Sequence, residues 1–123
     1  MFELAATLVN LAATEGGWTK RLDGLNGPIS GYSVGGNPRI PEKVIHGWRN
    51  VPGPALVYVV ARYLENAWNT GAGYTGGWVN PEDDSLVLDA PSIVKDLKLA
   101  KALGKHQGET AIFDIANGET IYL

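Results

Sequence analysis

Cysteine is absent from the 123 residues of this chain. The absence excludes disulfides, thiolate metal sites and cysteine nucleophiles, and it is compatible with a reducing cytoplasm. Basic residues are also scarce, because 10 Lys and Arg stand against 13 Asp and Glu and the formal net charge is −3. Proteins that bind nucleic acids neutralise phosphates with clustered Lys and Arg. We therefore expect no nucleic-acid partner.

Long apolar runs are missing as well, since no stretch approaches the ~18 uninterrupted apolar residues of a membrane span. The N-terminal segment is apolar, but it carries Glu3 where a signal peptide has positive charges, which favours an ordinary buried helix. We expect no membrane partner and a cytoplasmic location. A chain of this length normally forms one domain with one core, so we expect a single domain over residues 1–123.

Two hairpins are predicted in the C-terminal part of the chain. Residues 110–115 and 119–123 are rich in β-branched and aromatic side chains, and an Asn-Gly pair that tolerates the positive φ of tight turns joins them. Residues 77–79 and 85–89 flank a second turn, which is acidic and contains a proline. Short turns of this kind connect antiparallel strands.

A helix is predicted between the two hairpins. Apolar residues recur at helical spacing over residues 92–103, with Ser92 as a plausible start and Gly104 as a C-terminal stop. The opposite side of this segment carries four lysines, Lys95, Lys98, Lys101 and Lys105. The segment therefore has the pattern of an amphipathic surface helix.

The N-terminal half is less regular. Helical spacing predicts helices over residues 2–15 and 55–68, while residues 18–22 and 29–34 suggest a glycine-rich hairpin. Residues 39–45 are an extended candidate that Pro41 would either confine to an edge or interrupt. The order of elements predicts an α+β fold, a single domain with a mainly antiparallel sheet of about five to six strands packed by two to three helices.

Two carboxylates are candidates for acid–base chemistry. Asp89 and Asp114 each lie in a predicted strand with apolar neighbours, and two carboxyls in differing environments can act as general acid and general base. The simpler interpretation is that Asp89 caps the following helix and Asp114 faces water. His46, beside Trp48, is a third candidate for catalysis.

Metal and cofactor sites are not indicated. Neither His46 nor His106 has a second histidine at metal-binding spacing. The glycines of residues 71–77 follow a helix and precede a strand, whereas phosphate-binding loops have the reverse order. We expect no metal and no cofactor.

Aromatic side chains beside glycine-rich segments are the strongest binding candidates. Aromatic rings next to glycine provide stacking area for a ligand or partner at low entropic cost, although core packing is the favoured explanation for at least half of them. The five candidates are Trp18, Tyr32, Trp48, Tyr74 and Trp78.

Several segments carry a resemblance to a known group of proteins. The sequences GGWVNPE at 76–82, LVLD at 86–89 and AIFDI at 111–115, together with GYSV at 31–34, resemble those of small uncharacterised proteins from actinobacterial phages and mobile elements. The resemblance covers the C-terminal half well and the N-terminal half poorly. It implies a protein that works inside a bacterium, on a host component, and it implies no particular activity.

These observations favour a non-enzymatic binding module over an enzyme. The hypothesis is a phage accessory protein that engages a host protein or a small ligand through the glycine-rich aromatic surface. One alternative is a small hydrolase or transferase that uses Asp89, Asp114 or His46, whose side chains would then converge in one cleft. Another is a virion or scaffold subunit.

Overall fold

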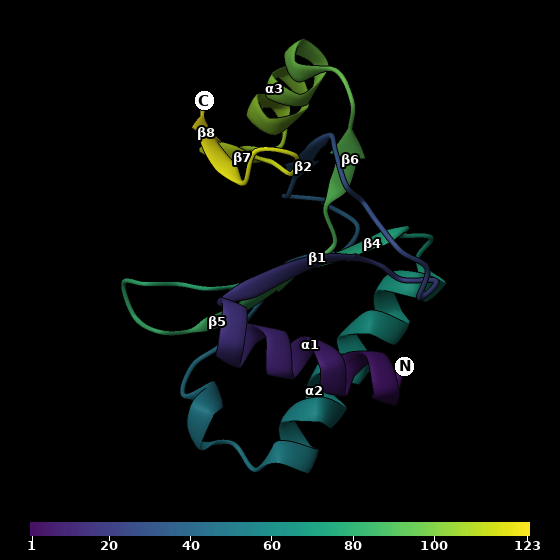
Figure 1. Cartoon of the computed structure of the whole chain (residues 1–123), viewed down its shortest axis with the longest axis vertical. Helices are drawn as coiled ribbons and strands as arrows, with labels where there is room; N and C mark the ends of the chain where they lie inside the picture. The colour runs from purple at the N-terminus through teal and green to yellow at the C-terminus, as the bar shows by residue number, and fades with distance from the viewer.

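The fold consists of two antiparallel four-stranded sheets and three α-helices, in a computed structural model that describes residues 1–123 (Figure 1). The elements in chain order are α1 (Phe2–Glu15), β1 (Gly17–Arg21), β2 (Tyr32–Val34), β3 (Lys43–Ile45), the 3₁₀ turn η1 (Trp48–Asn50), α2 (Gly53–Asn69), β4 (Tyr74–Val79), β5 (Leu86–Asp89), β6 (Ser92–Val94), α3 (Leu97–His106), β7 (Ala111–Asp114) and β8 (Glu119–Tyr122).

The two sheets lie between two layers of helix (Figure 1). The first sheet has the strand order β1-β4-β5-β3, and α1 and α2 cover its outer face. The second sheet has the order β6-β2-β7-β8, and α3 covers its outer face. The inner faces of the two sheets therefore point toward each other.

The larger core lies between the first sheet and its two helices. It contains 16 buried residues, among which Leu8, Leu64 and Leu86 are fully buried. Gly16 ends α1 in the left-handed conformation, and its N–H donates to the carbonyl of Ala12 at 3.2 Å. The predicted helices over residues 2–15 and 55–68 are confirmed as α1 and α2.

The smaller core lies under α3. Val34, Ala100 and Ile112 are its buried residues. Gly104 lies inside the helix, and a Cβ there would be 2.7 Å from Leu123 and 3.1 Å from Ile112. The prediction that Gly104 stops the helix is therefore wrong, because its lack of a side chain lets α3 approach the second sheet.

The single sheet of five to six strands predicted from the sequence is instead two sheets of four. The predicted hairpin of residues 18–22 and 29–34 is also wrong. β1 pairs with β4, where Trp18 lies opposite Gly77, and β2 pairs with β6 and β7 in the other sheet. The indole of Trp18 packs on Gly77, where a Cβ would overlap the ring, so the glycine explains why β1 selects β4.

The segment after Asp89 forms a strand before it forms a helix. Ser92–Val94 is β6 and pairs with β2. Its last two residues, Ile93 and Val94, are β-branched and favour a strand. The helix begins at Leu97, and its cap is Asp96, whose carboxylate accepts from the N–H of Leu99 at 2.8 Å. Asp89 therefore does not cap it.

The other two predicted hairpins are confirmed. β4 pairs with β5, β7 pairs with β8, and β3 lies at an edge of the first sheet. None of the helices combines the length and the apolar character that a membrane crossing requires.

Replacement of the α3 cap provides a first test of this part of the fold. We expect Asp96→Ala to lower the free energy of unfolding by about 1 kcal/mol, because the Leu99 N–H loses its acceptor. Asp96→Asn keeps an acceptor at this position and should cost much less. Urea unfolding followed by circular dichroism measures both variants, and equal losses in the two would contradict the capping role.

Candidate functional site

A cleft of about 880 Å³ lies between the inner faces of the two sheets. β1 and β4, with the last residue of β5, provide one wall, and β7 and β8, with Ser33 of β2, provide the other. The volume is in the range of small-molecule and peptide-side-chain sites. The cleft is therefore the main candidate for a functional site.

The inner faces are built to leave this space open. Sheets that pack as a sandwich carry interlocking apolar side chains, whereas the first sheet presents Gly17, Thr19 and Gly76 to the cleft. In β7, Ile112 packs into the core under α3, and its neighbours Ala111 and Phe113 therefore face the cleft. The alternation of the strands thus separates a packed outer face from an open inner face.

Carboxylates dominate the charged lining of the cleft. Glu15, Glu42, Asp89 and Glu109 line it, and no Lys or Arg does. None of these four acids takes part in the Arg21–Asp23 and Arg49–Asp84 ion pairs or in the contact between His46 and Asp83. The negative charge of the cleft is therefore not neutralised by the protein itself.

Asp89 and Glu109 converge on Gly35. A Cβ at position 35 would be 2.9 Å from Oδ2 of Asp89 and would overlap Oε1 of Glu109. Asp89 ends β5, just before the chain crosses to the second sheet, and Glu109 connects α3 to β7. Gln107 holds this corner together, because its Nε2 donates to the carbonyl oxygen of Gly35 at 2.5 Å. The absence of a side chain at position 35 lets the two carboxyls approach.

The environment of Asp89 disfavours its charge. Burial, followed by the charges of Glu109 and Glu42, raises the pKa of Asp89 to about 6. Burial and the charge of Glu42 also raise the pKa of Glu109. A positive group in the cleft would favour the ionised form of both carboxyls.

Exposed aromatic rings stand on both walls. Trp78 of β4 is 45% exposed, Phe113 of β7 is 40% exposed and Tyr122 of β8 is 79% exposed. Trp18 is buried beneath the same region, and its Nε1 donates to Oγ1 of Thr75 at 3.3 Å. Three large rings left partly in water around one cleft are a feature of binding surfaces.

Of the candidate aromatics, Trp78 faces the cleft, Trp18 borders it from the core beneath the first sheet, and the other three do not line it. Trp48 is 3% exposed in the larger core, with its Nε1 donating to the carbonyl of Asp84 at 2.8 Å. Tyr32 packs against the smaller core. Tyr74 is half-buried at the start of β4.

The structure does not bring the three candidate catalytic residues together. Only Asp89 lines the cleft. Asp114 is buried and accepts from Nδ2 of Asn117 at 2.8 Å, so it stabilises the β7–β8 turn, and the expectation that it faces water is wrong. His46 is exposed, with its Nδ1 3.8 Å from Oδ2 of Asp83.

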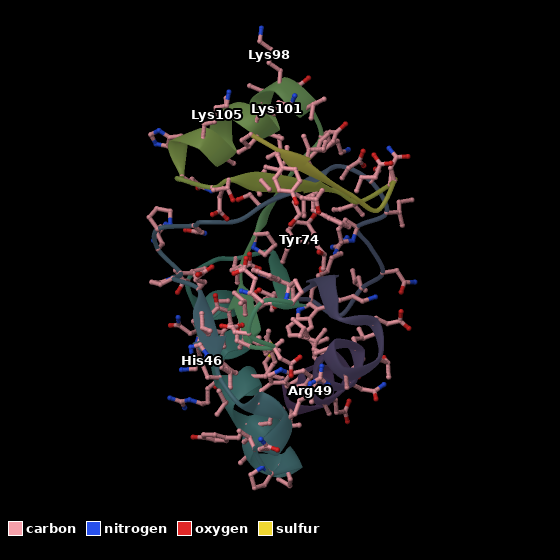
Figure 2. All side chains as sticks on the ribbon, turned by 90° about the vertical axis from the view of Figure 1, so that its left-hand side faces the viewer. His46, Arg49, Tyr74, Lys98, Lys101 and Lys105 are labelled. Carbon is pink, nitrogen blue, oxygen red and sulfur yellow. The ribbon has the colours of Figure 1, made fainter.

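Several basic side chains lie at the two ends of the molecule (Figure 2). Figure 2 shows Lys98, Lys101 and Lys105 on the outer side of α3, and His46 and Arg49 toward the opposite end of the molecule. The acidic cleft lies between these ends, on the face of the second sheet that α3 does not cover. No group of three or more His, Cys, Asp or Glu side chains has an arrangement that could hold a metal ion.

Five charged or aromatic residues of the cleft were missed from the sequence. Glu109, Phe113 and Tyr122 lie in the C-terminal part of the chain, and the alternation of Ile112 with Phe113 could have shown that one ring faces away from the core. Glu15 and Glu42 carry no local signal, because their position at the cleft depends on the tertiary fold. Comparison of the chain with protein-family models, with curated proteins and with solved structures found no match.

Proposed function

We propose that this protein is a binding module whose ligand carries an ammonium or guanidinium group into the cleft between the two sheets. One observation carries the proposal: Asp89 and Glu109 converge in a cleft that no Lys or Arg lines. Carboxylates that repel each other and lack a cationic partner favour an incoming positive charge.

The aromatic rings support the same ligand class. Cations bind the faces of Trp and Tyr rings, and Trp78 and Tyr122 are exposed on opposite walls. The apolar part of the ligand would contact these rings and Phe113 while its charge reaches the carboxyls. Negative charge focused in a cleft also raises the local concentration of cationic ligands.

The resemblance to phage and mobile-element proteins extends this proposal to a biological setting. The binding module would act inside a bacterium as a phage accessory protein, and its ligand would be a host protein that presents a basic side chain or a small host amine. The lysines on the outer side of α3 point away from the cleft and leave it accessible.

Titration with small probes tests the proposed ligand class. We expect butylammonium and butylguanidinium to shift the NMR signal of the Trp78 indole N–H, and butyrate, which has the opposite charge, to leave it unchanged. Asp89→Asn should weaken amine binding about tenfold, since one of two converging charges is lost. Binding should also weaken as the pH falls through about 6, where Asp89 takes up its proton.

The control for this titration is Glu3→Gln, which removes an exposed carboxylate from α1 on the far side of the first sheet. This variant should bind the amines as the wild type does. Equal shifts with butyrate and butylammonium, or an amine affinity that is unchanged in Asp89→Asn, would contradict the proposal.

A second candidate function is a small hydrolase or transferase. The observation in its favour is that the pKa of Asp89, about 6, suits proton transfer near neutral pH, beside a second carboxyl. Chromogenic esters, glycosides and phosphate esters are suitable probes. Turnover that both Asp89→Asn and Glu109→Gln abolish would establish this function, and the absence of turnover with all three classes would count against it.

A further inference from the structure

Strand β8 is an open edge of the second sheet, because its only neighbour is β7. The N–H of Leu123 donates to the carbonyl of Thr110 at 2.9 Å, which places Leu123 in a hydrogen-bonded pair with β7. Such pairs recur at every second residue of an antiparallel ladder. The backbone N–H and C=O of Thr120 and Tyr122 therefore point outward from the sheet.

The same two residues line the cleft with their side chains. In an antiparallel pair, residues directly opposite each other project to the same face of the sheet. The side chains of an added strand that lie opposite Thr120 and Tyr122 would consequently enter the cleft. The residues between them would lie on the other face, beside Ile121 and Leu123 at the edge of the smaller core.

The other sheet edges carry features that prevent strand addition. Basic side chains and prolines commonly protect edges. In the first sheet, β3 contains Lys43 and β1 contains Lys20 and Arg21. In the second sheet, β6 lies between Pro91 and Lys95. Strand β8, with the sequence ETIY, has no Lys, Arg or Pro.

We propose that β8 is a docking edge for an extended peptide in which basic side chains alternate with apolar ones. This inference rests on the proposed function, and it specifies the ligand as a peptide backbone that adds a strand to the second sheet. Charge complementarity selects the occupant, because the cleft beside β8 contains carboxylates and no cation. Backbone hydrogen bonds to Thr120 and Tyr122 would supply the remaining affinity.

A synthetic peptide tests the docking edge. The probe is an acetylated and amidated hexapeptide of alternating lysine and valine, and its binding is measured by calorimetry and by NMR shifts of β8 amides. We expect a version with N-methyl groups on its backbone to bind at least tenfold more weakly at the same charge, because it cannot complete the ladder. The protein is unchanged in this comparison, so folding does not affect it.

A pair of protein variants tests the same contact from the other side. Thr120→Pro removes an outward N–H, and Thr120→Val keeps that N–H with a similar side-chain volume. We expect the hexapeptide to bind at least tenfold more weakly to Thr120→Pro than to Thr120→Val. Butylammonium affinity is measured for both variants as well, because Thr120 lines the cleft and a loss shared by both ligands would report a change in the cleft and not in the strand edge.

The outcomes separate this inference from the proposed function. If butylammonium binds but N-methylation and Thr120→Pro leave hexapeptide affinity unchanged, the docking edge is overturned and the cleft proposal stands. If butylammonium does not bind at all, the cleft proposal itself falls, and this inference falls with it. Sedimentation that shows a dimer abolished by Thr120→Pro would overturn the inference in favour of a second copy of this chain on β8.

Discussion

Replacing Asp89 by asparagine is expected to stabilise the protein at neutral pH while it weakens cation binding. The folded state raises the pKa of Asp89 from 3.8 to about 6. A carboxyl with a raised pKa binds its proton more tightly in the folded state, so its favourable contribution is present below pH 3.8 and is lost as pH rises through about 6. Above that pH the ionised carboxylate destabilises the fold.

The raised pKa of Asp89 limits the loss of folding free energy caused by its charge to about 3 kcal/mol. Water in the open cleft makes the actual loss smaller. Asparagine has no charge to desolvate and keeps the shape of the side chain. We therefore expect the advantage of Asp89→Asn over the wild type to grow from about pH 4 to about pH 6 and then stay constant. Urea unfolding at half-unit pH intervals measures the difference.

A second variant at the same corner of the cleft provides the control. Glu109→Gln should shift the Asp89-dependent transition to lower pH, since it removes the main charge that opposes ionisation of Asp89. A constant difference between Asp89→Asn and the wild type from pH 4 to pH 8 would contradict the assignment.

The expected gain in stability has a functional meaning. Residues that destabilise a fold and have no structural partner are commonly kept for binding or catalysis. Asp89 could be replaced by a neutral side chain without loss of any ion pair. The unfavourable charge of Asp89 therefore supports the proposed role of the cleft as a site for a cationic group.

Local patterns in the sequence were sufficient to predict those helices and hairpins that depend on residues close together in the chain. The Asn117-Gly118 turn fixes the β7–β8 hairpin, and the spacing of apolar residues fixes α1 and α2. The segment at 92–94 was misassigned because its apolar residues also fit the period of the helix that follows. Pairing with β2, which is remote in the chain, decides in favour of a strand.

The candidate site could be predicted only in part for the same reason. Asp89 and Trp78 were identified because each stands out among its own neighbours. The role of Glu109 depends on Gly35, whose missing side chain is informative only once the two sheets are placed against each other. Trp18 was assigned to a hairpin with the wrong partner, since no local signal links it to Gly77.

The contact between Trp18 and Gly77 leads to the largest expected loss of stability. A Cβ at position 77 would overlap the indole of Trp18, which is buried between the first sheet and its helices. Gly77→Ala therefore forces the ring out of its place, and displacing a buried Trp costs about 3–5 kcal/mol. We expect urea unfolding to show a loss of this size together with a change in Trp fluorescence.

Gly73 provides a matched control for this substitution. It lies just before β4, and a Cβ there would meet no atom within 4 Å. Gly73→Ala should therefore change the free energy of unfolding by less than about 1 kcal/mol. A double-mutant cycle isolates the contact, because Gly77→Ala should cost much less in a Trp18→Leu background, where the smaller side chain leaves space. Equal costs in the two backgrounds would show that the overlap with Trp18 is not the cause, and would remove the explanation for the pairing of β1 with β4.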